Sequence, residues 1–161
     1  MLFSKETYIA RRQALSQRIK SGLIVLMGNN LSPVNYPANA YRFRQDSSFL
    51  YYFGQHREGL VGVIDTDEGK EWLIGDDIDI EDIVWFGSVD SLADMAAQSG
   101  VENSAPMAKL KELIDKTVAQ GRKVHFLPPY RHDLMIQLMD LTGIHPSEQR
   151  AKASLELIMA V

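Results

Sequence analysis

One short run of apolar residues constrains the fold more than any other feature of the sequence. Five consecutive apolar residues, Leu23 to Met27, stand between Gly22 and Gly28. A run this short and wholly apolar is typical of a β-strand that is covered on both faces. The strand is therefore predicted to lie inside a sheet with helices on both sides, and 161 residues suffice for one such domain.

Further strands and helices are predicted around this strand. Two β-rich runs, 60–64 and 71–74, are joined by the polar connection 65–70, which predicts an antiparallel hairpin. Residues 123–127 predict another strand, and the proline-containing stretch 29–39 predicts a long loop. Apolar residues at three- and four-residue spacing predict helices over 4–20, 91–98, 107–120 and 131–141. The predicted class is α/β, with a mixed β-sheet flanked by helices.

Arg12 lies on the apolar stripe of the first predicted helix, together with Tyr8, Leu15 and Ile19. An arginine in such a position usually extends its stem along the apolar surface and keeps its charge in water. Alternatively, it binds a carboxylate beneath the helix. In either case we interpret Arg12 as structural.

The charge and the composition exclude several classes of protein. A formal net charge of −4 argues against a nucleic-acid binder, which needs a basic face. The longest uninterrupted aliphatic run, 23–27, is far too short to cross a membrane, and residues 1–12 carry charges where a signal peptide would be apolar. Because the chain has no cysteine, it forms no disulfide, and a cytoplasmic location is favoured.

The common short sequence motifs of catalytic sites are absent from the sequence. These include the nucleophile elbow, the zinc motif H-E-x-x-H and the phosphate-binding glycine loops. The four histidines fall in different predicted elements, and His125, inside a strand, is expected to be a hydrogen-bonded structural residue. The acidic stretch 65–69 lacks the later ligands of a calcium loop and is better explained as a turn. A second acidic stretch, 76–82, offers oxygen ligands for a hard cation, but acids at a helix N-terminus are the favoured explanation.

The segment from Tyr41 to Gly54 resembles the N-terminal domain of the aminopeptidase P and prolidase family, also called the creatinase/prolidase N-terminal domain. The matching residues are Arg44, Gln45, Asp46, Ser47, Phe49, Tyr52 and Gly54. The chain departs from the family pattern at Ser48, where Asp or Asn is usual, and at Phe53, which directly precedes the glycine. We interpret the segment as a packing motif, in which Asp46 or Ser47 caps a short helix and Phe49, Tyr52 and Phe53 form its buried face.

The resemblance extends over about residues 3–145 and includes an acidic run that ends in Trp85-Phe86-Gly87. It implies a fold with a ribonuclease H-like motif. Residues 1–148 would form the aminopeptidase P N-terminal domain, and 149–161 would begin a linker toward a missing C-terminal pita-bread metallopeptidase domain. In the family that domain binds two metal ions, typically manganese, through Asp, Asp, His, Glu and Glu. By this resemblance the present chain contains no catalytic and no metal-binding residue and is inactive alone.

The resemblance also implies a function for the parent protein, an Xaa-Pro aminopeptidase that releases the N-terminal residue preceding proline. The implied partners are the C-terminal catalytic domain, peptides with proline at the second position, and further copies in a homo-oligomer. Trp85 is the candidate substrate-binding residue, toward a neighbouring subunit, with a purely structural role as the equal alternative. The apolar end of the chain, with Leu155, Leu157, Ile158 and Val161, agrees with a continuing polypeptide.

Two other functions stay open at this stage. One is a pseudo-enzyme of the same fold that acts as a peptide- or protein-binding module. The other is a metal-dependent nuclease, which the ribonuclease H-like topology suggests but the net charge disfavours. The sequence that follows Val161 would discriminate between enzyme and binding module, according to whether the five metal ligands are present.

Overall fold

A five-stranded mixed sheet forms the centre of the molecule. The computed structural model describes residues 2–77 and 90–161. The strand order is β6-β5-β4-β1-β7, with β1 antiparallel to β4 and parallel to β7. The strands are β1 Leu23–Met27, β4 Val61–Asp65, β5 Lys70–Ile74, β6 Asn103–Ala105 and β7 Val124–Phe126. The predicted α/β class with a mixed sheet and flanking helices is confirmed.

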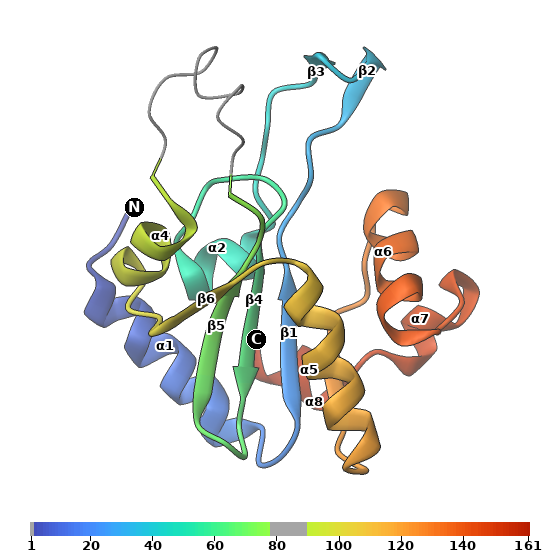
Figure 1. The fold of residues 1–161 in the computed structure, drawn as a ribbon. Coiled ribbons are helices and arrows are strands. Elements are labelled where there is room, and N and C mark those ends of the chain that lie inside the picture. The colour runs from blue at the N-terminus through green and yellow to red at the C-terminus, as the bar shows by residue number, and fades with distance from the viewer. Residues whose placement is uncertain (1, 78–89) are drawn as a thin grey trace.

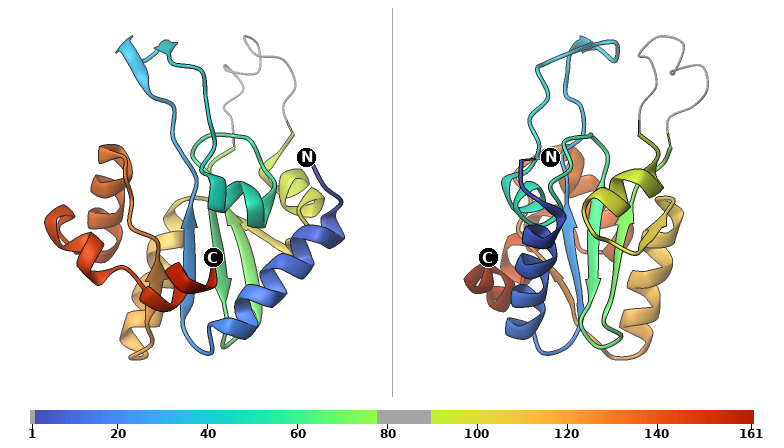
Figure 2. Two further views of the ribbon diagram at one scale, coloured as in Figure 1. Left: turned by 180° about the vertical axis from the view of Figure 1, so that it is seen from behind. Right: turned by 90° about the vertical axis from the view of Figure 1, so that its left-hand side faces the viewer.

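Helices cover both faces of this sheet (Figures 1 and 2). On one face lie α1 (Lys5–Arg18), α2 (Ser47–Phe53), α4 (Leu92–Gln98) and the C-terminal α8 (Leu155–Ala160). On the other face lies α5 (Ala108–Ala119), while α6 (His132–Thr142) and α7 (Pro146–Lys152) lie beyond β7.

The apolar run Leu23–Met27, which forms β1, has the predicted position. In β1, Ile24 and Leu26 pack into the core beneath α1, α2, α4 and α8, whereas Leu23 and Val25 pack into the core beneath α5. Because successive side chains of a strand point to opposite faces, a strand between two layers must be apolar at every position. The hairpin β4–β5 and the helices over 91–98, 107–120 and 131–141 are likewise present, with ends shifted by a residue or so.

The prediction of one long loop over residues 29–39 is wrong in part. Residues Pro33–Tyr36 form β2 and residues Asn39–Ala40 form β3, which pair as a small antiparallel hairpin. This hairpin projects from the body of the domain (Figure 1). Pro33 pairs with Ala40 here, as proline can in a two-stranded ribbon where each strand is an edge.

The expectation that Arg12 reaches water is also wrong, and the alternative is correct. The Arg12 side chain is fully buried, and its Nε donates a hydrogen bond to Glu71 Oε2 at 2.7 Å. Its two Nη atoms donate to the carbonyl oxygens of Tyr52, Ser99 and Gly100, each at 3.0 Å. The guanidinium therefore joins α1 to β5, to the end of α2 and to the end of α4.

Within residues 2–77 and 90–161, no helix is both long and apolar enough to cross a membrane.

Candidate functional site

The segment singled out in the sequence forms α2 and its two ends. Asp46 is the N-cap, and its Oδ1 accepts a hydrogen bond of 2.9 Å from the backbone N–H of Phe49. Phe49, Tyr52 and Phe53 are at most 4% exposed, so they form the buried face of the helix. The helix ends at Gly54, whose φ of 70° is a left-handed conformation that favours glycine.

Gln45 has a more specific role than its place in the motif suggested. Its side chain is buried, and its Oε1 accepts hydrogen bonds from the backbone N–H groups of Asn29 and Asp46, at 2.7 and 2.8 Å. Its Nε2 donates to the carbonyl oxygen of Arg57 at 2.7 Å. One amide thus fixes the end of β1, the start of α2 and the segment that leads into β4.

The other residues of the motif lie at the surface. The side chains of Arg44 and Ser47 are exposed, and the carbonyl oxygen of Arg44 accepts a hydrogen bond of 2.8 Å from Asn29 Nδ2. Ser48, where the sequence departs from the family pattern, lines the groove described next. Trp85, the predicted substrate-binding residue, lies outside the described residues.

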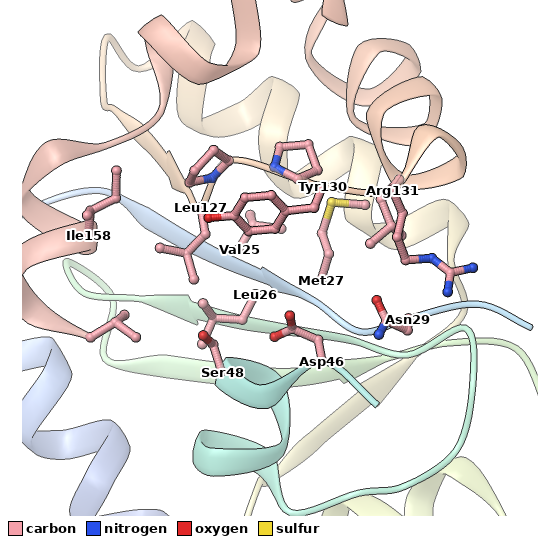
Figure 3. A pocket seen from close by; sticks show the side chains of 14 residues that line it. Val25, Leu26, Met27, Asn29, Asp46, Ser48, Leu127, Tyr130, Arg131 and Ile158 are labelled. Carbon is pink, nitrogen blue, oxygen red and sulfur yellow. The ribbon is translucent and has the colours of Figure 1, made fainter. Parts of the chain in front are cut away.

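A groove of about 390 Å³ lies between the start of α2, the C-terminal helix α8 and the segment that follows β7. Figure 3 shows Tyr130 and Leu127 along one side, and Asp46 and Ser48 along the other. The floor is apolar and comes from β1, and Ile158 stands at one end. We call this cavity the β1–β7 groove, because it lies where these parallel strands end, and it is the candidate functional site.

The opposite end of the β1–β7 groove is polar. Asn29 and Arg131 stand there, and Arg131 donates two hydrogen bonds of 3.1 Å to the carboxylate of Asp133. Asn30 Nδ2 donates to the same carboxylate at 3.2 Å. Partial burial raises the pKa of Asp133, but these hydrogen bonds outweigh it, so the net shift is downward. Asp133 is therefore ionised at neutral pH and orients Arg131.

The β1–β7 groove offers a ligand apolar contact and hydrogen bonds. Tyr130 is 87% exposed, so its ring is free to cover a bound apolar group. No His, Cys, Asp and Glu side chains within residues 2–77 and 90–161 gather in a group of three that could hold a metal ion.

The acidic stretches serve the fold. Asp65, which is 3% exposed, pairs with Arg122, and Asp67 accepts hydrogen bonds from the backbone N–H of Gly22 and the hydroxyl of Ser21. These bonds and that of Arg122 lower the pKa of Asp67. The interpretation as a turn is confirmed for residues 66–69, whereas Asp65 is the last residue of β4.

In the second acidic stretch only Asp76 and Asp77 lie within the described residues. Asp77 accepts a hydrogen bond from the backbone N–H of Leu92 at 2.7 Å, and Asp76 accepts one from that of Met107 at 2.9 Å. Both acids therefore serve helix N-termini, those of α4 and α5, which are distant in the sequence.

His125 is a hydrogen-bonded structural residue, as expected. It is 1% exposed, with Nδ1 at 2.7 Å from Ser154 Oγ and Nε2 at 2.9 Å from the carbonyl oxygen of Ser21. The hydroxyl of Ser154 also accepts a hydrogen bond from the N–H of Leu157 in α8. This pair therefore fixes α8 to the end of β7.

Sequence reasoning did not find the second side of the β1–β7 groove, formed by residues after 126. One signal was available, because the predicted strands 23–27 and 123–127 are each followed at once by a residue that ends a strand, Gly28 and Pro128. The carboxyl ends of parallel strands meet at one edge of a sheet, and ligands bind preferentially at such edges. The sequence did not indicate, however, that these two strands are neighbours.

Comparison with known proteins places the fold. A family model described as aminopeptidase P, N-terminal domain, matches residues 8–125. The Xaa-Pro dipeptidase of Homo sapiens is 29% identical over 91 residues, which cover 52% of this chain and 18% of that protein.

Two solved structures share the architecture. Aminopeptidase PepP of Pseudomonas aeruginosa matches 94% of this chain with a TM-score of 0.73 and 22% identity, over 35% of its own chain. Zinc-substituted aminopeptidase P of Escherichia coli in complex with product matches 86% with a TM-score of 0.69 and 18% identity, over 32% of its own chain. The chain thus spans about a third of the length of these solved proteins and less of the curated relative.

Proposed function

Because this chain belongs to the aminopeptidase P N-terminal domain family, we propose that it is the non-catalytic domain of a metal-dependent Xaa-Pro aminopeptidase. In this proposal the parent protein hydrolyses the bond between an N-terminal residue and a following proline. The family match over residues 8–125 carries the proposal, since it extends from within α1 to within β7 and so includes the other four strands of the sheet.

The metal ions of the parent, which we propose to be manganese, would be bound outside this chain. One observation supports this division: the solved relatives are about three times as long as the region that they share with this chain. Such ions would activate the attacking water.

The role that we propose for this domain is to form part of the substrate cleft and to assist assembly into a homo-oligomer in the cytoplasm. The β1–β7 groove supports the first part of the role, because it joins an apolar floor to a polar end. Such a combination suits a peptide, whose side chains need apolar cover and whose backbone needs hydrogen bonds. Trp85, which lies outside the described residues, remains the proposed substrate contact, toward a neighbouring subunit.

An activity assay tests the proposal. The chain is incubated with a peptide that has proline at its second position, with and without manganese, and released amino acid is measured. Escherichia coli aminopeptidase P serves as the positive control. We expect no turnover by this chain under conditions in which the control is active. Metal-dependent turnover by residues 1–161 alone would show that the catalytic groups are present and would overturn the proposal.

A further inference from the structure

A second cavity, of about 360 Å³, adjoins the β1–β7 groove at the base of the β2–β3 hairpin. Its lining brings together Arg42, Arg44 and Arg131 with Asn29, Asn30 and Tyr41. These side chains come from the end of β1, from the extended segment before α2 and from the segment before α6. We call this cavity the arginine recess.

The arginine recess is rich in hydrogen-bond donors and poor in acids. Among the described residues, the guanidinium groups of Arg42 and Arg44 take part in no ion pair and no hydrogen bond, and no acidic side chain lines the recess. Within residues 2–77 and 90–161, the one acidic partner of Arg131 is Asp133. Three guanidinium groups and one carboxylate therefore meet at one place in a chain whose net charge is −4. Such an excess of cations favours an anionic ligand.

The backbone that presents these arginines is fixed from both sides. Asn29 Nδ2 holds the carbonyl oxygen of Arg44 at 2.8 Å, and the backbone N–H of Tyr41 donates to the carbonyl oxygen of Ser32 at 2.9 Å. Arg42, Phe43 and Arg44 are consecutive residues of this segment and all three line the recess. Because the backbone is already ordered, the conformational entropy lost when an anion binds is confined mainly to the arginine side chains.

The arginine recess and the β1–β7 groove are neighbours, because Asn29 and Arg131 line both. We propose that the arginine recess binds the carboxylate groups of a short peptide whose apolar side chains lie in the β1–β7 groove. Planar guanidinium groups suit carboxylates, and the apolar floor of the groove accounts for the rest of such a ligand. The choice of a peptide as the carrier of the carboxylate rests on the proposed function, whereas the preference for an anion rests on the recess itself.

Calorimetric titration of the 161-residue chain tests this inference with two peptides. One is Leu-Pro-Leu-Glu with a free C-terminus, and the other is Leu-Pro-Leu-Gln with an amidated C-terminus. We expect the acidic peptide to bind at least about tenfold more tightly, because hydrogen bonds to charged groups contribute that much. We also expect the difference to decrease at high ionic strength.

The double variant Arg42→Gln/Arg44→Gln is expected to bind both peptides equally, with an unchanged thermal midpoint, because both side chains are exposed. Arg150→Gln is the matched control, since Arg150 is an exposed residue of α7 without a side-chain partner among the described residues, and it should bind as the native chain does. Equal binding of the two peptides by the native chain, or a preference that survives the double variant, would overturn the inference.

A third titration, with inorganic phosphate or acetate, tests whether the recess binds a peptide or simply a free anion. If inorganic phosphate or acetate binds as tightly as the acidic peptide, the apolar groove contributes nothing and the peptide assignment is wrong. The two failures are distinguishable, because the proposed function fails through peptide hydrolysis by this chain, whereas the present inference fails through the binding data.

Discussion

Replacing the buried arginine of α1 by methionine is the most informative test of the fold. In the native chain Arg12 is 0% exposed and donates to one carboxylate oxygen and to three backbone carbonyls. Methionine retains much of the apolar stem but has no donor. Arg12→Met therefore leaves the carbonyl oxygens of Tyr52, Ser99 and Gly100 without this donor at the centre of the helical layer.

The expected cost follows from these contacts. Breaking a buried ion pair by removing one partner typically costs about 3–5 kcal/mol. Each carbonyl that stays buried without a donor costs about 1–3 kcal/mol, and local relaxation and water recover part of the sum. We therefore expect a loss of about 3–5 kcal/mol, which lowers the thermal midpoint of a domain of this size by about 6–20 °C.

Urea unfolding followed by far-ultraviolet circular dichroism measures this loss. Arg18→Met is the matched control, because Arg18 lies on the same helix, is exposed and donates one hydrogen bond of 2.8 Å, to the carbonyl oxygen of Ala160. The control should lose about 1 kcal/mol or less. Glu71→Gln, alone and combined with Arg12→Met, completes a double-mutant cycle that isolates the ion pair. An Arg12→Met variant as stable as the control would show that the guanidinium is not the buried connection described here.

Three further predictions concern the helix α2, the pH dependence of stability, and Trp85. Phe49→Ala should lose about 3–5 kcal/mol in urea unfolding, because Phe49 is 0% exposed, while the exposed Ser47→Ala should change little. Asp133 has a lowered pKa in the folded chain, so its contacts stabilise the fold above the ordinary pKa of aspartate and are lost as the pH falls through the folded pKa. Asp133→Asn should therefore lower the thermal midpoint at neutral pH, and the difference should shrink near about pH 3; a difference independent of pH would contradict this. In an intact Xaa-Pro aminopeptidase that contains this domain, Trp85→Ala should lower kcat/KM and leave the thermal stability nearly unchanged, whereas a large loss of stability with normal kinetics would identify a core residue.

The elements that the sequence predicted correctly are those whose pattern is decided locally. The run 23–27 is apolar at every position because both faces of β1 are covered, and the helix over 47–53 carries its own cap in Asp46 and its own end in Gly54. The strand β6 escaped prediction because Asn103–Ala105 has no strand-like composition. Only its parallel pairing with β5 makes it a strand, and that contact joins residues about thirty positions apart.

The candidate site was harder to predict than the fold, for a related reason. Asp46 and Gln45 were found because they belong to one continuous segment. The opposing side of the β1–β7 groove depends on β7 lying beside β1 and on α8 returning to the sheet, which no local pattern encodes. Similarly, Arg42 and Arg44 attract attention only once Arg131, far along the chain, is placed across from them.

The two sides of the β1–β7 groove differ in their relation to the family. Asp46 and Ser48 belong to the span that the family model matches, whereas every lining residue from Leu127 onward lies beyond its end at residue 125. The last matched residue, His125, forms a hydrogen bond with the Ser154 hydroxyl, and this hydroxyl accepts another from Leu157 at the start of α8. The matched span thus supplies the floor and one side of the β1–β7 groove. The segments that follow it supply the other side, with Tyr130, Arg131 and Ile158. Replacing that other side alters the groove while the buried core under α1 and α2 stays intact, so selectivity for a ligand can change in this domain without a change of fold.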